Sequence, residues 1–158
     1  MRSISGYITS LQNDTYTTPG AAIEIAGSAY TADLIGYTYR ESALRERITT
    51  VVLDNTDQAL NTAGLARGDT VDIARGLYYN TTLYTAELPR VWIESLTWDR
   101  GYLILHCIDI WGKLARVRLS SAQSWSSTSI TTIADWILTQ AGLTRSGSLT
   151  ALTLDFTI

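Results

Sequence analysis

The chain has 158 residues, a formal net charge of -3 at pH 7 and 46% hydrophobic residues. This length and apolar content suffice for a folded core and argue against intrinsic disorder, and the charge argues against nucleic-acid binding through bulk positive charge. The single cysteine excludes an internal disulfide, and no apolar run approaches the ~20 residues of a membrane-spanning helix.

The first third of the chain is predicted to contain a polar arm and then three short strands. Residues 1–20 are rich in Ser and Thr, carry the turn signal Pro19-Gly20 and lack the apolar segment of a secretory signal, so they are predicted as an N-terminal arm. Residues 21–27, 34–40 and 46–53 have the β-branched or alternating pattern that is typical of strands.

The middle of the chain continues this pattern. The polar run at 54–57 ends the third strand because Asp and Asn favour turns, and residues 70–74 are predicted as a fourth strand. Residues 77–87 are rich in Tyr and Thr without a clear period, and they are predicted as a strand with a loop. Tyr is enriched in contact patches, so this stretch supplies three predicted interface residues: Tyr78, Tyr79 and Tyr84.

Residues 91–110 are predicted to form a β-hairpin around which the other strands assemble. Asp99-Arg100-Gly101 interrupts two arms rich in Val, Ile, Trp and Tyr. The predicted connection is a type I turn with Gly101 in the left-handed region, where glycine is favoured. The second arm is apolar at nearly every position, so both of its faces are expected to be covered. This register predicts the pairs Trp98 with Tyr102, Leu96 with Ile104, Glu94 with His106, and Trp92 with Ile108.

After residue 109 the sequence period changes towards that of a helix. Residues 110–115 suit a short helical turn, and residues 120–129 are predicted as a polar loop. Residues 130–141 place apolar side chains on one helical face. Thr128 or Ser129 is predicted to cap this helix, and Gly142 to end it.

The last residues are predicted to begin a further unit. Residues 144–149 are a polar linker, and residues 152–158 alternate as a strand without a predicted partner in this chain. An unpaired strand invites pairing with a neighbour, so Leu152, Leu154 and Phe156 are predicted interface residues. The predicted fold is mainly β, an antiparallel barrel or sandwich with one C-terminal helix. Its parts are an arm at 1–20, the β domain at 21–119, a loop and helix at 120–143, and the linker and strand at 144–158.

Residue types that carry chemistry are few. His106 and Cys107 are neighbours in a predicted strand, so their side chains point to opposite faces and cannot share a metal or act as a nucleophile–base pair. Cys107 is predicted as a small buried hydrophobe and His106 as a packed imidazole near Glu94. The chain has no nucleophile elbow and no phosphate loop. No catalytic residue, metal site or cofactor is predicted, and the chain is not expected to be an enzyme.

The tryptophans leave two interpretations open. In the predicted register Trp92 and Trp98 share a face with Leu96, which favours core packing. The alternative is an aromatic platform for a sugar or for a partner subunit.

Four stretches carry a family resemblance through their order and spacing. They are a strand that ends in Leu-Asp-Asn at 48–57, a loop with Gly before the next strand at 65–71, a strand that ends in Asp with a short turn at 103–114, and a helix that closes in Ala-Gly-Leu at 131–143. In this order they resemble the N-terminal part of phage tail hub proteins, the late-control-D class of baseplate hubs, over about residues 22–158.

The resemblance implies a tail-tube-like β-barrel that assembles as a ring at the tail tip, and the hub family suggests three copies. The implied partners are other copies of the chain and the tail-tube, tape-measure and tip or spike proteins, without sequence-specific nucleic acid or a membrane span. The implied location is the virion tail, assembled in the host cytoplasm. The predicted function is that of a structural subunit connecting the tail tube to the distal tip. The alternative is a tail-associated carbohydrate-binding module or peptidoglycan hydrolase component.

Overall fold

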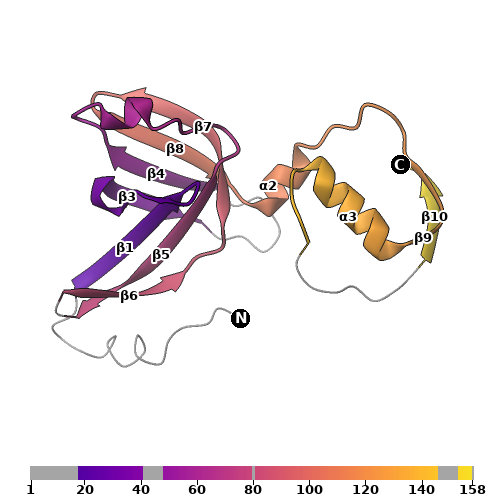
Figure 1. The fold of residues 1–158 in the computed structure, drawn as a ribbon, viewed down its shortest axis with the longest axis horizontal. Coiled ribbons are helices and arrows are strands. Elements are labelled where there is room, and N and C mark those ends of the chain that lie inside the picture. The colour runs from indigo at the N-terminus through magenta and orange to yellow at the C-terminus, as the bar shows by residue number, and fades with distance from the viewer. Residues whose placement is uncertain (1–17, 41–47, 80, 146–152, 158) are drawn as a thin grey trace. The chain divides into compact units, whose positions relative to one another are not determined.

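A computed structural model describes residues 18–40, 48–79, 81–145 and 153–157 of the chain. It divides into two compact units, Met1–Ile110 and Trp111–Ile158. The fold is mainly antiparallel β with one main helix near the C-terminus, which confirms the predicted fold class (Figure 1). No helix within these described ranges is long and apolar enough to cross a membrane.

The first unit is built on one antiparallel sheet with the strand order β2-β1-β5-β7-β8-β4-β3, in which β6 also pairs with β5 (Figure 1). Its strands are β1 (Thr18–Ile25), β2 (Ser28–Ala29), β3 (Leu34–Tyr39), β4 (Ile48–Asp54), β5 (Thr70–Tyr79), β6 (Thr82–Glu87), β7 (Val91–Asp99) and β8 (Tyr102–Ile108). Two 3-10 helices, η1 (Thr31–Asp33) and η2 (Ala59–Thr62), lie in the connections. Because β2 and β3 end the pairing order of the described strands, the sheet is open.

Strand alternation places the core on one face of this sheet. In β8 the side chains of Leu103, Leu105 and Cys107 are buried, whereas Tyr102 and His106 on the other face are exposed. The prediction that both faces of this arm are covered is therefore wrong for much of its length. β8 is central through its pairing with β7 and β4, but on its second face only Ile108 is buried and Ile104 is half-buried. The core consists of Ile23, Ile25, Val51, Leu53, Leu60, Val71, Ile73, Leu88, Val91, Ile93, Leu103, Leu105 and Cys107.

The β7–β8 hairpin has a tighter turn than the sequence predicts. Asp99 pairs with Tyr102, so the loop contains two residues, Arg100 at φ 45° and Gly101 at φ 89°. Two positive φ angles are the requirement of a type I′ turn, whose twist matches that of the flanking strands. The positive φ of Gly101 is confirmed, and the predicted type I turn is wrong.

The tighter turn shifts the hairpin register by one residue. His106 pairs with Ser95 instead of the predicted Glu94, which lies in a β-bulge between Ile93 and Ser95. The extra residue in the bulge restores the predicted register beyond it, so the predicted pair of Trp92 and Ile108 is present. The two remaining predicted pairs are also absent. Tyr102 pairs with Asp99 and Trp98 with Leu103, while Ile104 pairs with Thr97 and Leu96 with Leu105.

The first strand starts earlier than predicted. The predicted turn Pro19-Gly20 lies inside β1, which pairs with β5 from Thr18 to Ile25. Proline lacks a backbone N–H and is found in edge strands. Among the described residues, the second edge of β1 pairs only at Glu24 and Ile25, with β2, so Pro19 interrupts no strand pairing on that side.

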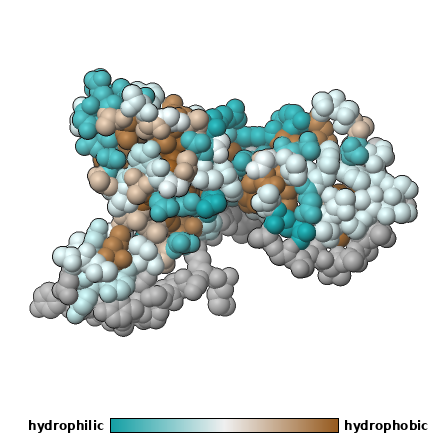
Figure 2. Space-filling view, in the orientation of Figure 1, coloured by the Kyte–Doolittle hydropathy of each residue, from teal (hydrophilic) through white to brown (hydrophobic). Residues whose placement is uncertain are grey.

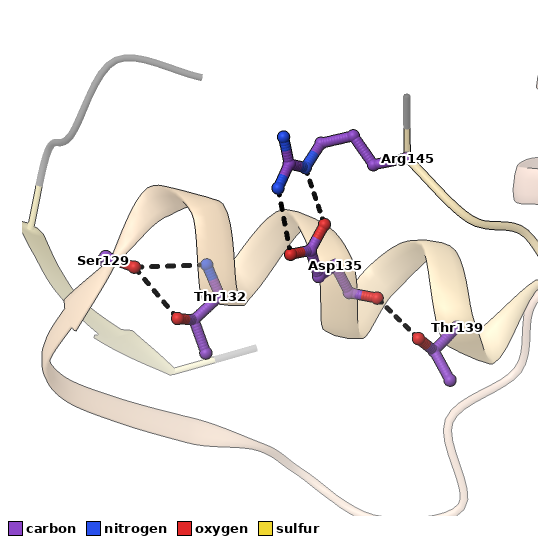
Figure 3. Close-up of polar contacts among 5 residues, drawn as sticks. All are labelled: Ser129, Thr132, Asp135, Thr139 and Arg145. Carbon is purple, nitrogen blue, oxygen red and sulfur yellow. Dashed lines mark hydrogen bonds and ion pairs between the residues drawn. The ribbon is translucent and has the colours of Figure 1, made fainter. Parts of the chain in front are cut away.

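The second unit contains α2 (Ile110–Ala115, starting at the last residue of the first unit), β9 (Ser124–Ser129), α3 (Ile130–Gln140) and β10 (Thr153–Thr157). The predicted helix is confirmed. Ser129 Oγ caps its start by accepting from Thr132 N–H at 3.2 Å (Figure 3). Gly142 follows its end at φ 65°.

Two predictions for the C-terminal part are wrong. Residues 124–129 form the strand β9, not a polar loop, and β10 has a partner in this chain because it pairs antiparallel with β9. The polar composition of β9 conceals its extended conformation, since the strand signal depends on β-branched and apolar alternation.

Candidate interaction surface

The β5–β6 hairpin carries the three predicted interface tyrosines. Tyr78 pairs with Leu83, Tyr79 with Thr82, and Leu77 with Tyr84. The side chains of Tyr78 and Tyr79 are 36% and 41% exposed, and Tyr84 is half-buried. Figure 2 shows a small hydrophobic patch on this hairpin, at the lower left of the view.

The tyrosines divide between the two faces of the hairpin. Residues at even spacing along a strand share a face, so Leu77 and Tyr79 lie on the same face of β5 as the buried Val71 and Ile73. Tyr84 joins them because it pairs with Leu77. The face that is buried in the body of the unit therefore continues into the hairpin, where Tyr79 remains exposed.

Two glycines bring the hairpin close to β1. Gly20 pairs with Gly76, and an added Cβ at Gly20 would lie 2.5 Å from Tyr78 Cε2 and 2.7 Å from Leu83 Cδ1. Tyr78 and Leu83 thus occupy the space above Gly20. An added Cβ at Gly76 would collide with the backbone carbonyl of Tyr84. Because neither position has a side chain, β1, β5 and β6 approach one another closely, and this packing fixes the position of the hairpin.

An open groove of about 530 Å³ lies between the edges of β1 and β3 and also contacts Tyr78. Residues 18–22 of β1 pair with β5 on one side, but within the described ranges neither their other edge nor the second edge of β3 has a strand partner. Ile35 is 54% exposed beside a register shift in β3. The unpaired edge of β1 ends at Ile23, because the N–H of Ile23 donates to Thr31 Oγ1 at 3.0 Å.

A cluster of acidic residues lies on the face of β1 and β5 that points away from the core. Glu24 and Asp72 form a cross-strand pair next to a hollow of about 340 Å³ that Glu87 also lines. Arg90 offsets the repulsion through a two-point contact with Asp72, with Nε–Oδ1 at 2.7 Å and Nη2–Oδ2 at 2.9 Å. Hydrogen bonding to Asp72 raises the pKa of Arg90. This arrangement fixes the segment before β7 to the sheet.

The two residues with reactive side chains, His106 and Cys107, lie on opposite faces of β8, as the sequence predicts. Cys107 is buried in the core, and burial raises the pKa of its thiol to about 12, so it is a poor nucleophile at neutral pH. His106 is exposed and lies opposite Thr50 and Ser95, so the prediction of a packed imidazole near Glu94 is wrong. Glu94 instead pairs with Arg67 at 2.9 Å. The described part of the chain gathers no three His, Cys, Asp or Glu side chains that could hold a metal ion.

The second unit holds two of the other predicted interface residues. Leu154 and Phe156 lie in β10, opposite Thr128 and Trp125 of β9, and Leu152 lies outside the described residues. The structure therefore places these positions in a strand that already has one partner.

The helix of this unit is anchored by polar and aromatic contacts. Arg145 donates to both carboxylate oxygens of Asp135, at 2.7 and 3.3 Å, and this contact lowers the pKa of Asp135 (Figure 3). Trp125 and Trp136 meet edge to face with ring centroids 5.2 Å apart.

One surface feature of the first unit was not predicted from the sequence. Residues 55–61 reach the turn of the β7–β8 hairpin and form with it a hollow of about 420 Å³, bordered by Trp98 and Tyr102. The two parts are some forty residues apart in the sequence, and only the turn signals at 54–57 and 99–101 marked them.

Comparison with known proteins identifies similarity to solved structures. No family model matches the chain, and no curated protein matches it. Among solved structures, the chain is similar to the 43 kDa tail protein of prophage MuSo2 from Shewanella oneidensis, with a TM-score of 0.46 and 12% sequence identity. The match covers 79% of this chain and 38% of that one, so the chain spans well under half the length of that protein.

Proposed function

We propose that the chain is a structural subunit of a phage tail, located in the tail tip or baseplate hub, where it connects the tail tube to the distal tip. The order of the sequence stretches that resemble tail hub proteins supports this function. The structural observation that carries it is the β5–β6 hairpin. The face of this hairpin that is continuous with the buried face of the sheet leaves Tyr79 exposed. Aromatic surfaces of this kind are enriched in protein–protein contacts.

The open groove between β1 and β3 supports the same function. An unpaired strand edge is a ready template for pairing with another chain, so natural proteins block it or use it. Pro19 removes one donor from the edge of β1, whereas Ile35 leaves an apolar side chain exposed at β3. A head-to-tail contact repeated by rotation closes into a ring, and the hub family suggests three copies.

Gold labelling of assembled particles tests this function. In phage particles produced from the genome that encodes the chain, a tagged copy is expected to bind gold at the tail tip, at one end of the tail. Tyr79→Ser is expected to reduce labelling because it removes the exposed ring of the hairpin. Trp111→Ser, which changes an aromatic residue 62% exposed in the second unit, is the matched control. Particles that assemble normally and never contain the tagged chain would contradict the proposal.

A further inference from the structure

The hollow at the end of the β7–β8 hairpin has the composition of a sugar-binding site. We propose that it binds a neutral saccharide, with Trp98 and Tyr102 as the rings that contact the sugar and Gln58 and Asn61 as its hydrogen-bonding amides. The volume of about 420 Å³ lies within the ~300–1,000 Å³ of small-ligand pockets, which combine apolar walls with a few placed polar groups.

Both aromatic residues that line the hollow are exposed. Trp98 is 49% exposed and Tyr102 is 43% exposed, although both lie in strands of the central hairpin. Trp98 pairs with Leu103 and Tyr102 with Asp99, so the two side chains lie on opposite faces of the hairpin, and both residues line the hollow. A pyranose offers an apolar C–H face to such a ring and hydroxyl groups at its rim, which suits the amphipathic character of Trp and Tyr.

The polar wall of the hollow is held rigidly. Asn55 is buried, and its Nδ2 donates to Asn61 Oδ1 at 3.0 Å while its Oδ1 accepts from Leu60 N–H at 2.9 Å. Asn55 N–H donates to the carbonyl of Gly101 at 2.7 Å, which joins this loop to the hairpin turn. Since Asn61 uses its carbonyl oxygen for Asn55, its amino group is available to donate to a ligand.

The start of the same loop is fixed by a second set of contacts. Asp54 Oδ1 accepts from the N–H and the hydroxyl of Thr56, at 2.9 and 2.8 Å, and these bonds lower the pKa of Asp54. Asp57 Oδ1 accepts from Ala59 N–H at 3.0 Å. A wall that is ordered before binding loses little entropy when a ligand enters, which favours affinity in a small site.

Backbone strain is concentrated at this hollow. Four described residues other than glycine have a positive φ, and two of them, Gln58 at 61° and Arg100 at 45°, line it. Asn, Asp or Gly would occupy these left-handed positions more easily. Strained residues cluster at ligand-binding sites, where surrounding structure maintains them.

The charges of the residues that line the hollow favour neutral sugars over acidic ones. Its charged lining residues are Asp99 and Arg100, whose charges cancel. A phosphate or an acidic sugar would meet one cation next to one carboxylate, whereas a neutral sugar can use both as hydrogen-bonding partners. We therefore expect neutral oligosaccharides to bind and acidic ones to bind more weakly.

The test uses the complete chain and three probes: chitotriose and maltotriose as neutral sugars, and 3′-sialyllactose as the acidic one. Binding is followed through the indole N–H signals in the NMR spectrum, with the Trp98 signal assigned from Trp98→Phe. A neutral sugar is expected to shift the Trp98 signal at concentrations up to about 10 mM. Trp98→Ala is expected to weaken binding by about tenfold.

Tyr102→Ser provides a second variant on the exposed face of the hairpin, in case loss of Trp98 affects folding, and Trp111→Ala is the matched aromatic control. Tyr102→Ser should weaken binding, and Trp111→Ala should leave it unchanged. The inference is overturned if no neutral sugar shifts the Trp98 signal, if both hollow variants bind like the parent chain, or if only 3′-sialyllactose binds. Tail labelling with gold is independent of each of these results.

Discussion

Gly101 is the residue on which the β7–β8 turn depends most directly. It has φ 89°, and an added Cβ would lie 3.0 Å from Thr56 Cγ2 and 3.3 Å from Thr56 Cα. A β-branched residue is strained at this φ, so Gly101→Val is expected to lower the free energy of unfolding by about 1–3 kcal/mol. Urea denaturation measures the change. Gly36→Val is the control, because its added Cβ contacts nothing within 4 Å, and an unchanged midpoint for Gly101→Val would disprove the assigned turn.

Gly76 is sensitive for a different reason, since its φ is not positive but β6 lies against it. Gly76→Ala is expected to cost about 1–3 kcal/mol, the range for overpacking, because the new methyl group collides with the Tyr84 carbonyl. Gly36→Ala should change stability little. Equal denaturation midpoints for the two alanine variants would show that β6 does not approach β5 as closely as described.

The buried thiol of Cys107 predicts a pH dependence of stability. Its pKa is raised to about 12 in the folded chain, whereas an exposed thiol titrates near 8.5. Between these values the unfolded chain releases the proton and the folded chain keeps it, so stability falls as the pH rises, by up to about 1.4 kcal/mol per pH unit. Urea denaturation between about pH 8 and 10 measures the slope. Cys107→Ala should have a shallower slope, and parallel slopes in the two proteins would contradict the assignment.

At the scale of the elements, the β7–β8 hairpin shows which structural features can be predicted from the sequence and which cannot. Alternation and the glycine located the two strands, and the pair of Trp92 with Ile108 was predicted correctly. The register near the turn was wrong because Arg100, and not only Gly101, has a positive φ. Propensity gives no signal for an arginine in that region, since Asn, Asp and Gly are the residues that favour it.

The helix α3 was the most predictable element, and its cap can be tested. Ser129→Ala is expected to lower the stability of the second unit by about 1 kcal/mol, because Thr132 N–H loses its acceptor. Ser129→Asp keeps an acceptor oxygen and should retain most of the stability. Far-UV circular dichroism during thermal unfolding compares the variants. Equal losses for both substitutions would show that the serine acts through its pairing in β9 and not as a cap.

At the scale of the whole molecule, sequence patterns predicted the mainly antiparallel fold but not the contacts between distant segments. The pairing of β9 with β10 uses a strand, β9, whose residues are mostly polar, and residues 55–61 contact the hairpin turn through a backbone hydrogen bond. Hydrophobic periodicity does not describe such contacts, because it reports only which residues face a core. The tyrosines predicted as interface residues were chosen from composition, and the face on which each lies required the strand register.

Native mass measurement of the complete chain across a dilution series, alone and with the tail-tube protein of the same phage, tests the central claim most directly. The proposed function predicts a ring, with three copies suggested by the hub family, that Tyr79→Ser shifts towards monomer and that Trp111→Ser leaves intact. A monomer at every concentration, for the parent chain and with tail-tube protein added, would contradict it.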